Sequence, residues 1–94
     1  MSEDLYKFRL YVSGDDSETR EMAEQMKKLL EENFGNVHLE VKDIFEEGNS
    51  TDASDDGVFS IPSLVKKLPP PLKQIIGDLY NAKAMLVILQ DMEE

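Results

Sequence analysis

The chain has 94 residues, 40% of them hydrophobic, and a formal net charge of −10 at neutral pH. This length predicts one small domain over residues 1–94, and the negative charge argues against nucleic-acid binding, which depends on basic groups that neutralise phosphates. The sequence contains no cysteine, which excludes disulfides, thiolate metal sites and thiol redox chemistry.

The sequence predicts a protein without membrane contact. No apolar run approaches the roughly 20 residues that a membrane-spanning helix needs, and acidic residues follow Met1, so we expect no secretory signal and a cytoplasmic location. Residues 1–58 contain sixteen acids and six bases, whereas residues 59–94 contain four of each. A local basic cluster in this second part would offer a partner contact, although ordinary solubilising charge explains it equally well.

The first half of the chain predicts a strand, a helix and a strand. Residues 7–12 alternate apolar and polar side chains with a period of two, and residues 37–43 repeat the pattern. Between them an apolar stripe begins at Met22, Asp15 is the predicted N-cap and Gly35 the predicted C-terminal cap. This succession predicts two parallel strands joined by a right-handed crossover.

The outward faces of these two strands are unusually polar for a parallel sheet, which is normally covered on both sides. They carry Arg9, Tyr11, His38, Glu40 and Lys42. We therefore expect a thin cover, a partner or water on this side. The single histidine has no recognisable catalytic companion and is expected at the surface.

Residues 46–57, EEGNSTDASDDG, show no periodicity and predict a flexible acidic loop. Their alternating Asp and Asn residues weakly resemble a calcium loop, but the required glycine and terminal bidentate glutamate are missing from that register. We expect neither a metal site nor a cofactor. The chain also lacks a nucleophile paired with a base and a phosphate-binding loop, so we predict no catalytic residues and no enzymatic activity.

Two secondary-structure interpretations compete for the stretch that begins at residue 59 and holds all four prolines. In the first, residues 63–68 and 72–76 form a hairpin around the prolines at 69–71, because proline cannot donate to a ladder and favours the turn. A helix then follows from about residue 81 to residue 92, where good helix formers carry apolar residues at near-helical spacing.

In the second interpretation, Pro71 is the first residue of a helix and residues 85–89 form a buried strand. We favour the first, because Gly77 and Asp78 form a turn signal that would interrupt the competing helix. The resulting order is β, α, β, loop, β, β, α, the thioredoxin-type arrangement, with Pro62 at the start of the third strand. The Cys-x-x-Cys motif that would follow the first strand is absent.

Four segments of the sequence resemble the KaiB family of circadian clock proteins. They are LYVSG at residues 10–14, IPSL at 61–64, LPPP at 68–71 and IIGDL at 75–79. The resemblance spans nearly the whole chain. Its LPPP-x-x-x-IIGDL segment is specific, because neither part is a generic loop or helix pattern.

The resemblance implies a non-enzymatic protein that binds the ring-shaped ATPase KaiC, sequesters KaiA and so regulates circadian timing. It also implies a metamorphic α/β chain, in which a thioredoxin-like monomer, βαβ(α)ββα, interconverts with a ground-state homotetramer of different topology. The two interpretations of residues 59–94 correspond to these states, which need to differ by only a few kcal/mol. The alternative is a sensory or stress-response module, related to the input domain of the kinase SasA, with a partner other than KaiC.

The resemblance also suggests site residues. The expected partner contacts are Arg9, Lys66, Lys67 and Lys73. The residues expected to set the isomer state and hinge of a fold switch are Pro62, Pro69, Pro70, Pro71, Gly77 and Asp78. Each proline also has a simpler explanation as a turn residue.

Several positions depart from the family pattern. Lys73 and Gln74 stand where the family has paired arginines, and Glu21 replaces an arginine, which weakens the implied binding to an acidic KaiC surface. Residues 88–90 replace a Gly-Leu-Asp sequence, which removes a helix-destabilising glycine. The acidic loop is longer than usual and lacks an Asn-Pro helix start. We therefore expect a thioredoxin-like monomer, with a short or absent helix before residue 59.

Overall fold

The computed structural model describes residues 5–14, 16–58, 60–75 and 78–92. The elements in chain order are β1 (Tyr6–Val12), α1 (Ser17–Phe34), β2 (Val37–Asp43), α2 (Asn49–Asp55), β3 (Ser63–Leu68), β4 (Lys73–Ile75) and α3 (Ala82–Met92). The four strands form one sheet in the order β2-β1-β3-β4. The β1–β2 pair is parallel, as the strand–helix–strand pattern predicts, and the other two pairs are antiparallel.

Helix α1 begins and ends at the kinds of residue that the sequence indicated. The carboxylate of Asp16 accepts a hydrogen bond from the Thr19 backbone N–H at 2.8 Å, so Asp16 is the N-cap. The predicted cap, Asp15, lies outside the described residues. Gly35 ends the helix with φ +83°, a conformation that suits glycine, and its N–H donates to the Glu31 carbonyl.

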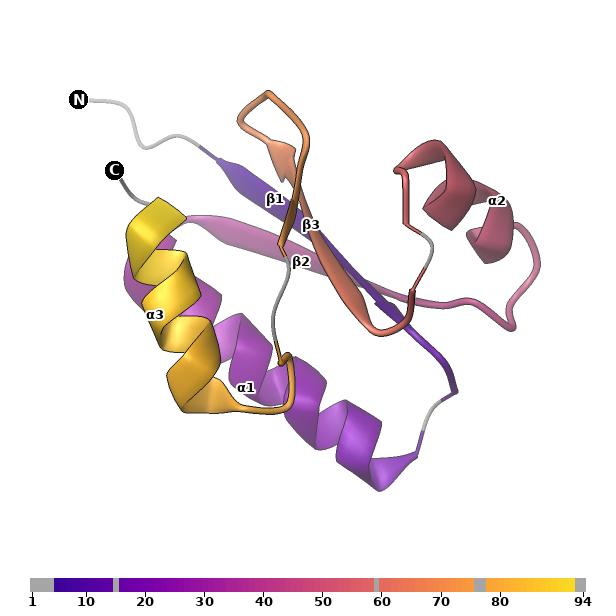
Figure 1. The fold of residues 1–94 in the computed structure, drawn as a ribbon, viewed down its shortest axis with the longest axis horizontal. Coiled ribbons are helices and arrows are strands. Elements are labelled where there is room, and N and C mark those ends of the chain that lie inside the picture. Colours follow the sequence, from indigo (N-terminus) through magenta and orange to yellow (C-terminus); the bar gives the residue numbers. More distant parts are fainter. Residues whose placement is uncertain (1–4, 15, 59, 76–77, 93–94) are drawn as a thin grey trace.

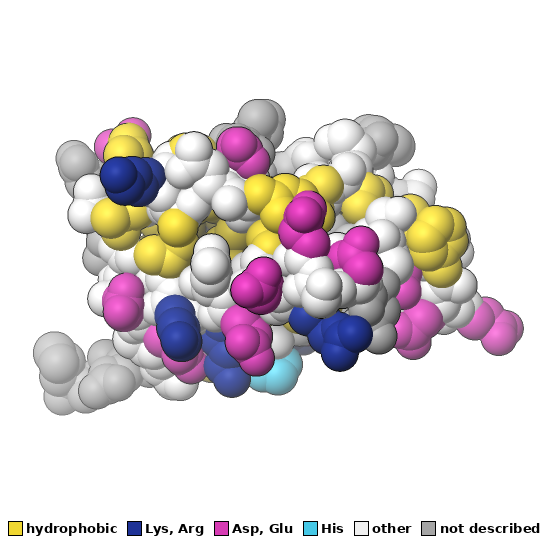
Figure 2. Space-filling view, turned by 90° about the horizontal axis from the view of Figure 1, so that it is seen from below, with side chains coloured by type: hydrophobic (Ala, Val, Ile, Leu, Met, Phe, Trp, Pro, Cys, Tyr) yellow, Lys and Arg dark blue, Asp and Glu magenta, His cyan; other side chains and the backbone are white. Residues whose placement is uncertain are grey.

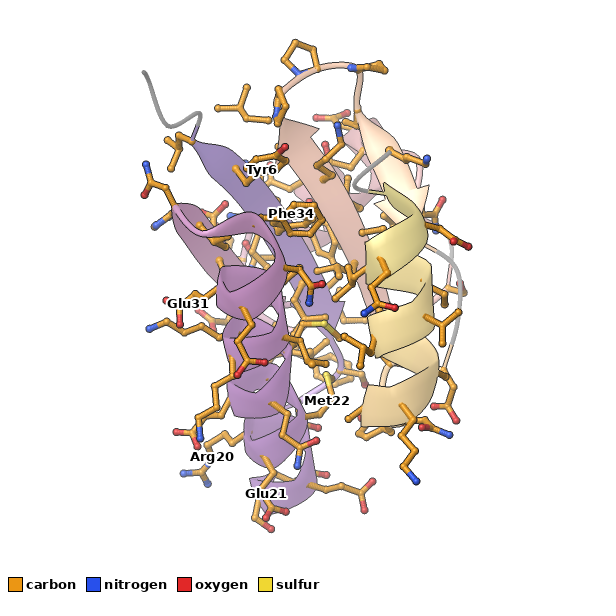
Figure 3. All side chains as sticks on the ribbon, turned by 90° about the vertical axis from the view of Figure 1, so that its left-hand side faces the viewer. Tyr6, Arg20, Glu21, Met22, Glu31 and Phe34 are labelled. Atoms are coloured by element: carbon orange, nitrogen blue, oxygen red, sulfur yellow. The ribbon has the colours of Figure 1, made fainter. Side chains whose placement is uncertain are left out.

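Helices α1 and α3 lie side by side on one face of the sheet, and α2 lies on the other (Figure 1). The main core fills the space between the sheet, α1 and α3, and its buried members are Phe8, Leu10, Val12, Met22, Met26, Leu30, Leu64, Ile75, Leu79, Met85 and Leu89. Tyr6 and Phe34 close one end of this layer, with their ring centroids 4.7 Å apart (Figure 3). A second, smaller cluster of Tyr11, Ala53, Val58 and Val65 lies between α2 and the other face of the sheet.

The C-terminal third forms a hairpin followed by a helix, so the first interpretation is confirmed and the helix–strand alternative is wrong for this structure. Strand β4 is shorter than predicted and begins at Lys73. The side chain of Asn81 accepts from the Ala84 N–H at 3.1 Å, which places Asn81 just before the first turn of α3. Met85 and Leu89, four residues apart on one helix face, are fully buried.

The segment 46–57 is not a loop throughout, because α2 occupies seven of its residues. Its residues are mostly poor helix formers without an apolar stripe, which is why periodicity alone misses the helix. Helix α2 supplies the thin cover expected over the polar face of the sheet. Within the described parts of the chain, no helix has the length and apolar character needed to cross a bilayer.

Candidate functional site

The four predicted basic contacts do not form one patch. Lys66 and Lys73 lie opposite each other in the β3–β4 register, on the face that also holds the buried Leu64. Successive side chains of a strand point to opposite faces, so Lys67 lies on the other side. There it shares a carboxylate partner with Arg9.

That shared partner is Asp56, the residue that ends α2, whose side chain is 3% exposed. The Tyr11 hydroxyl donates to Asp56 Oδ2 at 2.5 Å, and Arg9 Nη1 donates to the same oxygen at 3.1 Å. Lys67 Nζ donates to Asp56 Oδ1. Arg9 also reaches Glu40 on β2, with 2.8 Å between Nε and Oε1. One carboxylate therefore ties α2 to both β1 and β3.

The protonation states of this network follow from burial and mutual contact. Burial disfavours the charged form of Asp56, but hydrogen bonds from its three partners outweigh burial and lower its pKa. Burial, together with the hydrogen bond to Asp56, raises the pKa of Tyr11 to about 12. The hydrogen bond from Arg9 lowers the pKa of Glu40. At neutral pH Tyr11 is thus a neutral donor and both carboxylates are charged acceptors.

Helix α2 has further polar attachments to β2. Lys42 Nζ lies 3.1 Å from an Asp52 oxygen, and the Asn49 side-chain amide donates to the Asp43 carbonyl at 2.8 Å. Ala53 is the buried apolar residue of the helix, and burying one methyl group contributes only about 0.8 kcal/mol. Helix α2 is therefore attached to the sheet mainly by charges and hydrogen bonds.

Sequence reasoning missed Asp56 because it treated the whole acidic segment as solvated. A usable signal was present. Arg9, Tyr11 and Lys42 point to the face opposite the core and need partners, and the acidic segment 46–57 follows directly after the second of the two strands that carry them. The need of these cations for counterions would have predicted that they pair with the acidic segment, although not that Asp56 is the residue that does so.

The prolines cluster around β3. The Ile61–Pro62 bond before β3 is cis, as are the Leu68–Pro69 and Pro70–Pro71 bonds between β3 and β4. Leu68 and Leu72 flank this turn and are 40% and 47% exposed. The hairpin tip thus presents an apolar, proline-rich surface, and Lys66 Nζ donates to the Pro69 carbonyl at 2.7 Å beside it.

The remaining predicted hinge residues lie between β4 and α3. Asp78 is exposed, and its side chain accepts from the Tyr80 N–H at 3.1 Å, which shapes the turn into α3. Gly77 lies outside the described residues. Gln74, which replaces a family arginine, is partly buried with its amide 3.4 Å from the Ser63 hydroxyl, whereas Lys73 is exposed on the edge strand.

A pocket of about 280 Å³ opens where β1 and β2 end and α1 begins, the place of the redox motif in thioredoxin-type proteins. Its lining residues are Val12, Gly14, Thr19, Arg20, Ala23, Val41, Asp43 and Glu46. Asp43 Oδ1 accepts from the N–H groups of Gly14 and Phe45, so this carboxylate fixes the surrounding loops. These lining residues supply no paired nucleophile and base.

One face of the molecule mixes hydrophobic and charged side chains (Figure 2). Figure 2 shows a band of hydrophobic side chains with acidic ones beside it. In Figure 3, Arg20 and Glu21 lie at the first turns of α1. Among the residues that the structure describes, no group of three or more His, Cys, Asp or Glu side chains could hold a metal ion.

Comparison with known families finds one matching model, the KaiB domain, over residues 9–91. The circadian clock oscillator protein KaiB of Microcystis aeruginosa is 36% identical over 90 residues, which covers 95% of this chain and 85% of that protein. The circadian clock oscillator protein KaiB1 of Synechocystis is 35% identical over 83 residues, covering 87% of this chain and 77% of the relative.

Solved structures share the fold at low sequence identity. The Trx4 domain of ERdj5 superposes with a TM-score of 0.64 at 15% identity, over 97% of this chain and 82% of that one. A designed protein superposes with a TM-score of 0.70 at 20% identity, over 99% and 79%. These likenesses show a thioredoxin-like α/β fold.

Proposed function

Because the chain belongs to the KaiB family, we propose that it is a non-enzymatic interaction module that binds a KaiC-type ATPase ring and contributes to circadian timing. The observation that carries the proposal is the family match over residues 9–91, with 36% identity to a clock oscillator protein. The pocket at the redox position, without a paired nucleophile and base, favours binding over catalysis.

The hairpin edge is the surface that we propose for ring contact. Strand β4 is an edge of the sheet and has three residues, of which Lys73 is exposed. Leu68 and Leu72 at the neighbouring turn add exposed apolar area, and interfaces commonly combine apolar anchors with a charged rim. Lys66 lies beside Lys73, so the two cations together favour an acidic patch on the partner.

We further propose that the thioredoxin-like monomer is the form that binds. The full burial of Met85 and Leu89 supports the thioredoxin-like part of this proposal, since the two side chains anchor α3 against the core. Interconversion with a homotetramer remains a prediction from the resemblance. Sedimentation velocity of the purified chain measures its oligomeric state, and a dominant tetramer would count against the monomer.

The binding test mixes the purified chain with a purified KaiC-type ring and follows complex formation by sedimentation or fluorescence anisotropy. Lys73→Glu should weaken binding about tenfold, because reversing one rim charge costs about 1.4 kcal/mol of binding free energy. The matched control is Lys28→Glu on the exposed face of α1, which should change the affinity less than about twofold.

Two outcomes would contradict this proposal. If a folded parent chain shows no binding to the ring at high concentration, the sensory-module alternative with another partner becomes the better explanation. If binding occurs but Lys28→Glu weakens it as much as Lys73→Glu does, net charge rather than the hairpin edge governs the contact.

A further inference from the structure

Residues 49–56, here called the acidic lid, cover a cationic and aromatic face of the sheet. Asp56 pairs with Arg9 and Lys67, and the Asp52 carboxylate lies 3.1 Å from Lys42. The lid thus supplies carboxylates to three cations that come from three different strands. Glu40 of β2 also pairs with Arg9 and Lys42, so a molecule that replaced the lid would have to supply a carboxylate above all to Lys67, and further carboxylates near the other two cations would strengthen its binding.

The lid has little apolar attachment of its own. Ala53 is its buried hydrophobic side chain, and Ser50, Thr51, Ser54 and Asp55 are exposed. By contrast, α3 buries two large side chains completely in the main core. Elements with few buried apolar contacts open at lower free energy than the core does. The lid is therefore the described element best suited to separate from the sheet without global unfolding.

Both ends of the lid carry a glycine with positive φ. Gly48 has φ +88° and Gly57 has φ +77°, and neither has a neighbouring atom within 4 Å of the position of an added Cβ. Gly48 also provides no side-chain cap to α2. Glycines tolerate large changes in φ and ψ, and hinges are a few such positions at element ends. A glycine that can act as a pivot thus bounds the lid at each end.

The covered face would be a coherent docking surface if the lid moved. Arg9 lies directly opposite Val65 in the β1–β3 register, and Tyr11 and Lys67 border this pair on the same face. The surface would then offer an apolar centre between cations, with the Tyr11 hydroxyl as a further donor. This composition suits an acidic peptide segment with small side chains, which is the chemistry of the lid itself.

We propose that the acidic lid is an autoinhibitory segment, and that the sheet face beneath it binds an acidic segment of a partner protein when the lid is displaced. This would make Arg9 and Lys67 partner contacts that are available only in the open form. Lys66 and Lys73 on the hairpin edge would stay accessible in both forms. The proposal does not depend on whether the partner is a KaiC-type ring.

The test uses a synthetic peptide of residues 46–57 as the probe and the isotope-labelled full chain as the receptor. The receptor carries Asp52→Asn and Asp56→Asn, which remove the lid carboxylates while keeping the side-chain shapes. In this receptor the peptide should shift the amide signals of Arg9, Tyr11 and Lys67, with an affinity about tenfold higher than for the parent. A control peptide with asparagine at positions 52 and 56 should shift none of them.

Equal shifts with both peptides, or none in a folded receptor, would overturn the proposal. Adding Arg9→Gln to the receptor should abolish the shifts, and their persistence would refute the assigned face. If the receptor variant does not fold, hydrogen exchange on the parent chain tests whether the lid opens separately from the sheet. Amides of the lid should then exchange about tenfold faster than those of β1, and identical protection would show that the lid does not open separately.

Discussion

The packing of α3 can be tested with two substitutions whose relative effects on stability differ between the two interpretations of the C-terminal third. In the helix, Leu89 is fully buried and Val87 is 61% exposed. In a strand over residues 85–89, alternation would place both side chains on the same face. Removing side-chain carbons from each position therefore reports which secondary structure the segment adopts.

Leu89→Ala removes a fully buried isobutyl group and leaves a cavity between α1, α3 and the sheet. Such substitutions cost 2–5 kcal/mol, so we expect a loss of about 3 kcal/mol in the free energy of unfolding. For a domain of this size, that corresponds to a fall of about 15 °C in Tm. Val87→Ala should leave stability unchanged or raise it by about 0.5 kcal/mol, because alanine is the better helix former.

The assay is urea unfolding followed by circular dichroism, with the m-value checked for each variant. If residues 85–89 formed a buried strand instead, Val87→Ala would delete two buried methyl groups and cost about 2 kcal/mol. A comparable loss in the two variants would refute the helical packing. A small loss for Leu89→Ala would refute the placement of this side chain in the core.

Two further predictions concern the polar face and the end of α1. The pKa of Asp56 in the folded chain lies below its unfolded value, so the charged carboxylate stabilises the fold above about pH 4. This stabilisation is lost as the pH falls through the folded pKa. Urea midpoints measured between pH 7 and pH 2.5 should therefore fall less steeply for Asp56→Asn than for the parent. Gly35→Ala, at φ +83°, should cost about 1 kcal/mol, because side chains disfavour positive φ, and an unchanged urea midpoint would refute the positive φ at this cap.

Periodicity predicted the first half of the fold well because each element there buries one regular face. The pattern of residues 7–12 gave β1 to within one residue, and the apolar stripe from Met22 gave α1 with its glycine end. The hairpin and α3 followed from turn chemistry at the prolines and at Asp78. These signals depend only on residues that are close together in the sequence, so they can be recognised without knowledge of long-range contacts.

The polar face could not be predicted in the same way, because its structure depends on contacts between residues far apart in the sequence. Asp56 and Arg9 are 47 positions apart, and nothing in the local pattern of residues 46–57 indicates a helix. The grouping of Lys66 with Lys67 was wrong as a surface because adjacent strand residues point to opposite faces. Whether either lysine contacts a partner stays a prediction.

The two faces of the sheet are covered by elements that respond to different perturbations. The face under α1 and α3 is held by apolar burial, so its stability follows cavity size and temperature. The face under α2 is held mainly by the carboxylates of Asp56 and Asp52 and by the Asn49 amide, so its stability follows the charge on the two carboxylates. Neutralising a lid carboxylate should therefore loosen α2 while leaving Met85 and Leu89 packed. The chain would in this way change one surface without unfolding the core that positions the other.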